Sequence, residues 1–391
     1  METVKAGVHM NYYRDTFLEI NLDHVFHNVS HLLGSLPPPV RMMAVIKADS
    51  YGHGAVMIAK TLLEAGIDHF AVATLDEAIE LRRAKIHCPI LVLGGSRIVD
   101  LPLIQKHHIT IGIHSMEWLN KALLSYHGKP IDVHLKYDSG MNRLGFTSIE
   151  EYLQAINMIR QSSQFTLKGL YSHLASAETP DESYYLMQVE RFEEMLARVD
   201  ITGLLIHLGN SAGSFKPKPS HVNMVRIGLL INGQTPSKSL NLGFELKPSL
   251  SLYSHLVQVK TVPAGTKISY NGLYVTQEIT VIGTIPIGYA DGYDRRLENG
   301  RVFIEGEYCP VVGRICMDYC LVKLPKLLPE GTKVELIGEH ITIDEYSEKI
   351  RTNNYHATCQ FSDRLPRKYI KNGFLVKTTN RRLSTPIGGH L

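Results

Sequence analysis

The chain has 391 residues, of which 44% are hydrophobic and 20% are charged, and its formal net charge at pH 7 is +3. This length exceeds what one hydrophobic core usually serves, so we expect a globular protein of two domains. The small net charge, without a long block of like charges, argues against binding to nucleic acid or to an anionic membrane. No apolar run reaches the length of a membrane span.

Five cysteines are spread along the chain. Their spacing gives neither a disulfide framework nor the ligand set of a zinc site. The N-terminal stretch "METVKAGVHMNYYRDTF" lacks the apolar core of a signal peptide. We therefore expect a cytoplasmic protein without a bound metal.

Short apolar segments alternate with helical patterns over roughly the first 230 residues. One helical pattern follows Asp23, a plausible N-cap, and another opens at Asp76. Eight apolar segments are predicted as strands: 43–47, 70–73, 90–93, 110–113, 132–136, 169–173, 204–207 and 224–230. Repeated strand–helix units imply parallel strands with crossover helices, and eight units favour an N-terminal (β/α)8 barrel of the TIM type.

The pattern changes after about residue 240, where apolar and polar residues alternate between glycine-containing turns. Helical signal returns only at 344–350. We expect a mainly-β C-terminal domain, with the barrel over residues 1–240 and the β domain over residues 241–391.

Polar residues recur where the predicted barrel strands end. Lys47, Lys136, His173 and His207 each close a predicted strand, and Arg226 lies inside the eighth. A lone lysine at a strand end can extend its amine into water, and a lone strand histidine is usually a satisfied core residue. Five such groups at the catalytic end of a barrel are costly to bury without partners, so they favour a binding site.

The loops after the seventh and eighth strands read "HLGNSAG" and "RIGLLING", and small residues there suit a phosphate group. A phosphate site facing a lysine suggests pyridoxal phosphate, which also needs a partner for its ring nitrogen. Arg226 is the candidate partner, and arginine only donates hydrogen bonds. An unprotonated ring would delocalise a carbanion less and favour return of a proton to Cα, which is racemisation.

Several longer motifs carry a resemblance to a known family. In the first part they are "AVIKADSYGHG", "KYDSGMNRLGF", "YSHLASAE", "HLGNSAG" and "VRIGLLING", and in the second part "ISYNGLY", "IPIGYADGYDRRL", "PVVGRICMD" and "NYHATCQFSDRLPR". Together they resemble the alanine racemase family, which joins a pyridoxal-phosphate barrel to a β domain. The resemblance implies a cytoplasmic homodimer with shared active sites that interconverts L-alanine and D-alanine and supplies D-alanine for peptidoglycan.

The resemblance also implies a two-base reaction at Cα of a pyridoxal-phosphate aldimine. Lys47 would hold the cofactor and act as the base on one face, and Tyr270 would act on the other. The residues implied to bind the phosphate are Tyr51, Asn210, Ser211, Gly228 and Tyr355.

Further roles follow from the same resemblance. Arg226 would meet the ring nitrogen, supported by His173. Arg143 and the backbone of Met317 would hold the substrate carboxylate, and a carbamate on Lys136 would orient Arg143. Tyr289 and Arg295 would line the entrance and the layer behind it. Tyr270 and Met317 would reach the barrel of the partner subunit.

Four residues depart from the family pattern: Asn271, Tyr319, His356 and Asp363. Asn271 replaces a glycine, and asparagine tolerates left-handed backbone better than most residues, so we expect the turn to persist. Three other functions stay open: a non-catalytic pyridoxal-phosphate carrier, a decarboxylase of basic amino acids, and a racemase for serine or larger amino acids. A carrier would have one domain only, and a decarboxylase would need an acidic pocket.

Overall fold

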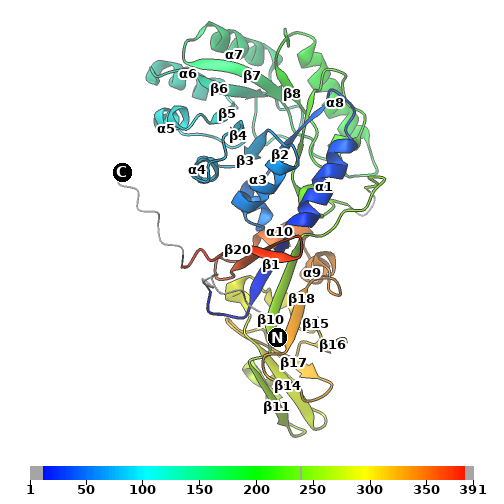
Figure 1. The fold of residues 1–391 in the computed structure, drawn as a ribbon. Helices are drawn as coiled ribbons and strands as arrows, with labels where there is room; N and C mark the ends of the chain where they lie inside the picture. Colours follow the sequence, from blue (N-terminus) through cyan, green and yellow to red (C-terminus); the bar gives the residue numbers. More distant parts are fainter. Residues whose placement is uncertain (1–11, 238–239, 384–391) are drawn as a thin grey trace. The chain divides into compact units, whose positions relative to one another are not determined.

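A computed structural model describes residues 12–237 and 240–383 (Figure 1). The chain divides into two compact units. One is His24–Pro248, called here the barrel unit. The other, called the β unit, comprises the described residues of Met1–Asp23 and Ser249–Leu391.

Eight parallel strands close into a barrel, which confirms the predicted fold of the first part. They are β2 (Arg41–Val45), β3 (Phe70–Val72), β4 (Ile90–Val92), β5 (Thr110–Ile113), β6 (Ile131–Lys136), β7 (Phe165–Tyr171), β8 (Leu205–His207) and β9 (Met224–Ile227). The main helices of this part of the chain are α1 (Leu22–Gly34), α3 (Ala55–Glu64), α4 (Leu75–Arg83), α5 (Leu101–Lys106), α6 (Met116–Ser125), α7 (Ile149–Gln161) and α8 (Ser183–Leu196). Because the strands are parallel, their carboxyl ends meet at one rim of the barrel.

The helices begin where side chains satisfy their first backbone N–H groups. Thr74, one residue before α4, accepts from the backbone of Glu77, and the Glu77 carboxylate reaches back to form a capping box. The predicted start at Asp76 is therefore one residue late, since α4 begins at Leu75. Asp23 lies inside the first turn of α1 and is not its N-cap, a position where its charge still favours the helix dipole.

Five predicted strands end one to three residues earlier in the structure, and two of these shifts affect site residues that were predicted to close their strands. β2 ends at Val45, so Lys47 belongs to the turn that follows and does not close the strand. β7 spans Phe165–Tyr171, which leaves His173 two residues beyond it. Lys136 and His207 are the last residues of their strands, as predicted.

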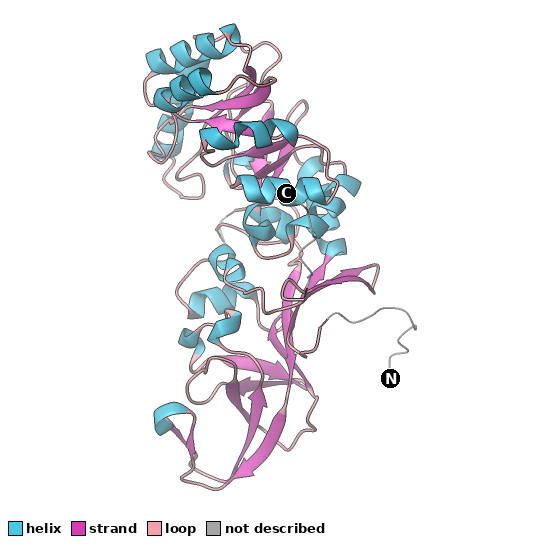
Figure 2. Ribbon diagram, turned by 90° about the vertical axis from the view of Figure 1, so that its left-hand side faces the viewer, coloured by secondary structure: helices cyan, strands magenta, loops and turns pink. Residues whose placement is uncertain are grey.

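The β unit contains three sheets (Figure 2, strands in magenta). The largest has the order β16-β15-β18-β10-β1-β19-β20, a second has the order β11-β14-β17, and β12 pairs with β13. The strands are β1 (Phe17–Asn21), β10 (Leu250–His255), β11 (Gln258–Val262), β12 (Lys267–Ile268), β13 (Tyr274–Val275), β14 (Thr280–Ile285), β15 (Arg301–Ile304), β16 (Glu307–Pro310), β17 (Cys320–Leu324), β18 (Lys333–Ile337), β19 (Arg367–Lys371) and β20 (Phe374–Thr379). Two helices accompany them, α9 (Ile343–Lys349) and α10 (Asn354–Cys359).

The N-terminal strand β1 belongs to the β unit, although the sequence placed residues 1–240 in the barrel. It pairs antiparallel with β10 and parallel with β19. Leu18 and Ile20 are fully buried there, so the apolar side chains at alternate positions of β1 pack in the core of the β unit. Among residues 12–237 and 240–383, no helix is both long and apolar enough to cross a membrane.

Candidate active site

A cavity of about 230 Å³ lies among the carboxyl ends of the barrel strands. Nine of the predicted site residues line it: Lys47, Tyr51, Lys136, Arg143, His173, Asn210, Ser211, Arg226 and Gly228. The other lining residues are Val45, Ala73, Leu93, Gly94, Leu144 and Tyr171. Residues from Val45 to Gly228 therefore share one cavity, because the carboxyl ends of parallel strands meet at the same rim.

Lys47 and Tyr51 are the two ends of the turn α2 (Lys47–Tyr51), which has an unusual backbone. Ala48, Asp49, Ser50 and Tyr51 have φ values of 51°, 55°, 51° and 54°, in the left-handed region. For residues other than glycine this conformation costs roughly 1–2 kcal/mol each. The turn places the amine and the phenol in the same cavity, and sequence patterns gave no sign of it.

Contacts from distant segments hold this strained turn. The carboxylate of Glu77, in α4, accepts a hydrogen bond from the backbone N–H of Ala48 at 2.7 Å. The side-chain amide of Asn232 donates to the carbonyl of Ser50 at 3.2 Å. Strained backbone persists only where its surroundings fix it, and such places cluster at functional sites.

Opposite the amine, small residues form a cradle suited to an anion. A Cβ atom on Gly228 would lie 2.4 Å from the phenol oxygen of Tyr51, so a larger residue there would displace the tyrosine from the cavity wall. The backbone N–H of Gly228 donates to Ser211 Oγ at 3.2 Å. Asn210 Oδ1 accepts from the N–H of Gly213 at 2.9 Å, which orders the loop after β8. Hydroxyl and backbone N–H groups thus gather as a phosphate would require.

Arg226, from β9, is buried, and four of its five N–H groups are held by the barrel. One terminal nitrogen donates to Nδ1 and the carbonyl of His207, at 2.9 and 3.1 Å. The other donates to the carbonyl of Ser172 at 2.7 Å and lies 3.2 Å from Nδ1 of His173. Within the described residues no protein group accepts from Nε. That N–H is therefore available to a ligand in the cavity that Arg226 lines.

This arginine fixes the tautomers of two buried histidines. Arginine only donates, so Nδ1 of His207 must accept, and its proton sits on Nε2. Nε2 of His207 lies 2.7 Å from Nδ1 of His134, so that His134 in turn carries its proton on Nε2. Burial, with the positive charge of Arg226, holds the pKa of His207 well below its usual value. Both rings are therefore neutral at physiological pH.

Lys136 is also buried, and burial together with the charges of Arg226 and Arg143 lowers its pKa to about 8. Its amine lies 5.9 Å from the ring centre of Tyr171, and the guanidinium of Arg226 lies 5.5 Å from the same centre. Tyr171 stacks on His207 at 4.7 Å and was missed by sequence reasoning. Its position at the end of a strand, two residues before His173, was the available signal.

Arg143 lies on a loop organised by one carboxylate. Asp138 accepts backbone hydrogen bonds from Gly140 and Asn142 at 3.0 Å each, and from Arg143 at 3.1 Å. Gly145, with φ of 127°, closes the loop against the backbone of Asp138. The exposed Arg143 side chain is therefore presented by an ordered backbone.

The other five predicted site residues belong to the β unit: Tyr270, Tyr289, Arg295, Met317 and Tyr355. Tyr270 begins a 3-10 turn, Tyr270–Gly272, and its side chain is 67% exposed. Asn271 has φ of 62°, the left-handed conformation expected of it. Ser269 Oγ donates to the carbonyl of Arg314 at 2.8 Å, so the Tyr270 turn is fixed to the segment before Met317.

Met317 and Tyr289 lie on adjoining loops. The N–H groups of Tyr289 and Ala290 donate to the carbonyls of Cys316 and Met317, each at 3.1 Å. A Cβ atom on Gly288 would lie 2.3 Å from both carbonyls, so only glycine permits this approach.

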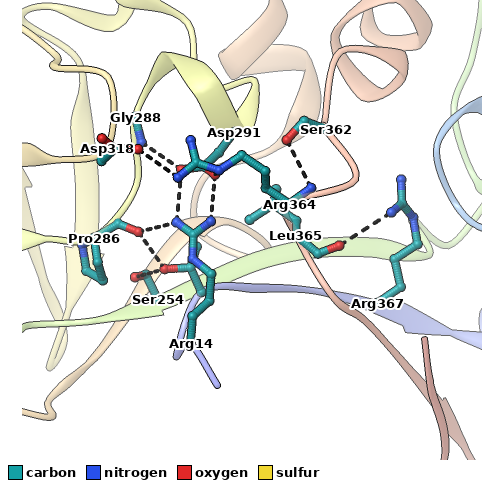
Figure 3. Close-up of polar contacts among 11 residues, drawn as sticks. Arg14, Ser254, Pro286, Gly288, Asp291, Asp318, Ser362, Arg364, Leu365 and Arg367 are labelled. Atoms are coloured by element: carbon teal, nitrogen blue, oxygen red, sulfur yellow. Dashed lines mark hydrogen bonds and ion pairs between the residues drawn. The ribbon is translucent and has the colours of Figure 1, made fainter. Parts of the chain in front are cut away.

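A buried carboxylate holds these loops in place (Figure 3). Asp291 accepts two hydrogen bonds from Arg14, at 2.6 and 2.9 Å, and one from the N–H of Gly288 at 3.1 Å. Arg364 lies 3.4 Å from Asp291 and bonds Asp318, the neighbour of Met317, at 2.7 Å. Arg364 thus joins the Tyr289 loop to the Met317 loop, while Arg14 holds Asp291 in place.

Arg295 and Tyr355 are the remaining predicted site residues of the β unit. The guanidinium of Arg295 lies 5.9 Å from the ring centre of Tyr289. Tyr355 lies on α10 and is 39% exposed. Tyr270, Met317, Tyr289 and Tyr355 all remain substantially exposed in the single chain.

A barrel with an amine, an anion cradle and a buried arginine at its carboxyl rim, joined to a separate β unit, defines a class of cofactor-dependent barrel enzymes. Comparison with known proteins specifies the family. Residues 20–236 match the N-terminal domain model of alanine racemase and residues 249–369 match its C-terminal domain model. The chain belongs to the alanine racemase family of amino-acid racemases, which depend on pyridoxal phosphate, and the resemblance seen in the motifs is confirmed.

Individual relatives agree over nearly the full length. An alanine racemase of Geobacillus kaustophilus is 43% identical over 376 residues, covering 94% of this chain and 98% of the relative. A crystal structure of alanine racemase from Bacillus anthracis with bound L-Ala-P has a TM-score of 0.90 at 37% identity, covering 94% and 98%. A histidine racemase from Leuconostoc mesenteroides is more distant, with 28% identity and a TM-score of 0.86 over 92% and 99%.

Proposed function

We propose that this chain interconverts L-alanine and D-alanine by moving the Cα proton between Lys47 and Tyr270, with pyridoxal phosphate as cofactor. The observation that carries the proposal is Arg226, which is buried with one N–H left for the cavity that also contains Lys47. A donor-only partner keeps the cofactor ring nitrogen unprotonated, which disfavours transfer of the proton away from Cα.

The residues present fit the cofactor. Lys47 would bond its aldehyde, while Tyr51, Asn210, Ser211 and Gly228 would surround its phosphate, together with Tyr355. His173, with a pKa held well below its usual value by burial and by Arg226, would support both the ring and the arginine as a neutral group. When bound, the cofactor supplies the electron sink that makes the Cα proton acidic.

The chain's own groups would position the substrate and move the proton. Arg143 and the backbone of Met317 would hold the substrate carboxylate, which turns Cα between the two bases. Lys47 would take or return the proton of the D-enantiomer, and Tyr270 that of the L-enantiomer. A tyrosine is too weakly acidic to act as a base near neutral pH unless a cation lowers its pKa, and Arg143 would supply that charge.

Lys136 is proposed to carry a carbamate. Its amine is buried, and its pKa of about 8, lowered by burial and by Arg226 and Arg143, gives a neutral fraction that can attack carbon dioxide with loss of one proton. The product would exchange a cation for an anion beside two arginines, which removes a repulsion and orients Arg143. A ¹³C signal from protein incubated with ¹³C-bicarbonate, absent in Lys136→Ala, would establish the carbamate.

We propose a head-to-tail homodimer in which Tyr270 and Met317 complete the site of the partner subunit. Their exposure, 67% and 52%, supports this role, because side chains that serve chemistry need a closed surrounding. Tyr289 and Arg295 would line the entrance. D-alanine made in the cytoplasm would then be available for peptidoglycan.

The deciding experiment follows the α-proton of L-alanine by NMR in D₂O, with purified protein and pyridoxal phosphate. We expect loss of the signal together with D-alanine on chiral analysis, and weaker turnover of serine, since one hydroxyl is poorly discriminated. Tyr270→Phe should lose exchange from L-alanine by at least about 10²-fold, while Tyr308→Phe, another exposed tyrosine of the β unit, should not. A retained α-proton with cofactor bound would contradict alanine racemisation and favour a carrier.

A further inference from the structure

A second cavity, of about 330 Å³, lies at the opposite end of the barrel from Lys47. Its lining includes the first residues of four strands, Arg41 of β2, Phe70 of β3, Thr110 of β5 and Leu205 of β8. The strands are parallel, so these residues mark the amino-terminal rim. The proposed racemase reaction makes no use of this cavity.

His134 of β6 contributes a buried polar group to this cavity. The side chain is 3% exposed, and its Nδ1 is committed to His207 at 2.7 Å. The tautomer set by Arg226 leaves a proton on Nε2, and within the described residues no protein group accepts it. Nε2 is not sealed from the cavity that His134 lines, so water or a ligand oxygen there can accept this hydrogen bond.

The imidazole of His134 fits inside the barrel because the neighbouring strand has a glycine beside it. A Cβ atom on Gly169 of β7 would lie 2.7 Å from two atoms of the His134 imidazole. The pairing of β6 and β7 also shifts register between Val133 and His134. Glycine and the irregular register together let a bulky polar ring occupy an interior position of the barrel.

The mouth of the cavity carries charge, and its walls are mainly apolar, with His69 and Thr110 as polar lining residues besides His134. Arg41 and Lys168 line it with side chains 45% and 50% exposed, and Asp132 is the lining carboxylate. Arg41 is already bonded to Asp68 at 2.5 Å, but Lys168 lies 3.9 Å from Asp132, beyond a hydrogen bond. The apolar lining residues are Met43, Phe70, Pro89, Leu91 and Leu205.

We propose that this cavity binds a small aliphatic carboxylate that bears a second oxygen acceptor on its chain, such as an oxo acid. Its carboxylate lies at the mouth near Lys168, where it stays partly hydrated. Its chain packs between Met43, Leu91 and Leu205, and its carbonyl oxygen accepts the Nε2–H bond of His134. The charged, apolar and hydrogen-bonding parts of the ligand thus lie beside charged, apolar and hydrogen-bonding residues of the cavity, respectively.

The test compares pairs of acids that differ only in the carbonyl. Calorimetric titrations of the holoenzyme would use 4-oxopentanoate against pentanoate, and 5-oxohexanoate against hexanoate. We expect the better oxo acid to bind roughly threefold to tenfold tighter than its plain partner, because one neutral hydrogen bond is gained. Equal affinities within both pairs, or no binding of any acid, would overturn the proposal.

Variants separate this cavity from the catalytic one, which also attracts carboxylates. Lys168→Glu should weaken binding of the oxo acid roughly threefold to tenfold, while the same charge change at the exposed Lys129 should not. His134→Phe keeps a ring beside Gly169 but removes the hydrogen-bond donor. In this variant the oxo acid should bind no tighter than the plain acid. A Lys168→Glu effect no larger than that of Lys129→Glu would overturn the proposal.

A crystal structure of the holoenzyme with the preferred oxo acid gives an answer independent of folding effects. The expected result is ligand density with its carbonyl oxygen within hydrogen-bond distance of His134 Nε2. Density found only beside Arg143, at the other end of the barrel, would show that the acid is a substrate-site competitor and would contradict the site.

Discussion

The cationic side chains are buried at the carboxyl rim of the barrel and about half exposed at the amino rim. At the carboxyl rim, Arg226 and Lys136 are each 4% exposed. At the amino rim, Arg41 and Lys168 have side chains about half exposed. Burying a cation is costly, and of the two barrel rims only the carboxyl rim, beside Lys47, buries its cations. A left-handed turn adds backbone strain at the same rim.

The carboxyl rim offsets part of that cost with backbone and imidazole acceptors in place of carboxylates. Arg226 donates to carbonyls of Ser172 and His207 and to histidine nitrogens, and no lining residue of the cavity is acidic. An anionic substrate or cofactor would therefore supply the missing negative charge. At the amino rim, carboxylates of the chain already lie near the cations, Asp68 at 2.5 Å from Arg41 and Asp132 at 3.9 Å from Lys168.

The largest effect on the carboxyl rim is expected from Lys47→Ala. We propose that Lys47 both bonds the cofactor and moves a proton, so its removal should lower kcat by at least about 10³-fold. The cofactor's visible absorption should change as well, because the amine bond is lost. Steady-state kinetics and absorption spectra would check this, with Lys129→Ala as the control for a lost surface charge. A variant retaining a tenth of the activity would contradict the role of Lys47.

The next prediction tests how closely the carboxyl rim is packed. Two adjacent glycines, Gly94 and Gly95, provide a variant and a matched control. A Cβ atom on Gly94, which lines the cavity, would lie 2.4 Å from the carbonyl oxygen of Ala73, whereas Gly95 has open space. We expect Gly94→Ala to lower the free energy of unfolding by roughly 1–3 kcal/mol and Gly95→Ala to change it by less than about 0.5 kcal/mol.

Urea titrations followed by fluorescence would measure this difference. Trp118 is the sole tryptophan and lies in the barrel unit, where it donates to the carbonyl of Ser96 at 2.7 Å, so its emission reports on that unit. Equal stability of the two variants would mean that the backbone around Gly94 yields easily, against the picture of a rigid carboxyl rim.

The sequence predicted the number of barrel strands, because short apolar segments and their polar ends are local signals. Of the nine predicted site residues that line the cavity, Tyr51, Arg143 and Gly228 came from the family resemblance and not from such signals. The sequence failed to predict the turn after β2. No local preference places Ala48 to Tyr51 at positive φ, since the conformation depends on Glu77 and Asn232 from distant segments.

Long-range pairing explains the other failures. The sequence analysis predicted no strand over residues 17–21 and included them in the barrel domain, because the β1 partner β10 begins more than two hundred residues later in the chain. His134 and Tyr171 look like ordinary strand residues, and only their neighbours in space, His207 and Arg226, give them a role. The periodicity of the sequence shows which face of a strand is buried, but it does not show which strands or side chains pack against that face.

A third test concerns pH. The pKa of Lys136 is lowered to about 8 by burial and by the charges of Arg226 and Arg143. The unfolded chain then binds more protons than the folded one between about pH 8 and the usual lysine pKa near 10.4, so the stability of the unmodified protein should rise with pH there. The slope is at most about 1.4 kcal/mol per pH unit for one proton.

Urea midpoints of carbon-dioxide-free protein at several pH values would show this rise, and Lys136→Met should flatten it. The difference between the two proteins isolates Lys136 from other titrating groups. A Lys136→Met profile parallel to that of the wild type would mean that the amine is well solvated, and would remove the electrostatic contrast between the two rims.

The smallest effect is expected at the amino rim. Arg41 and Asp68 form an ion pair at 2.5 Å with side chains 45% and 60% exposed. Water competes for both groups, so a double-mutant cycle with Arg41→Gln and Asp68→Asn should give a coupling energy below about 1 kcal/mol. That coupling should shrink further in 1 M salt, where screening acts over roughly 3 Å. A coupling above about 2 kcal/mol that survives high salt would mean that this pair is effectively buried, and that charge burial does not distinguish the catalytic rim from its opposite.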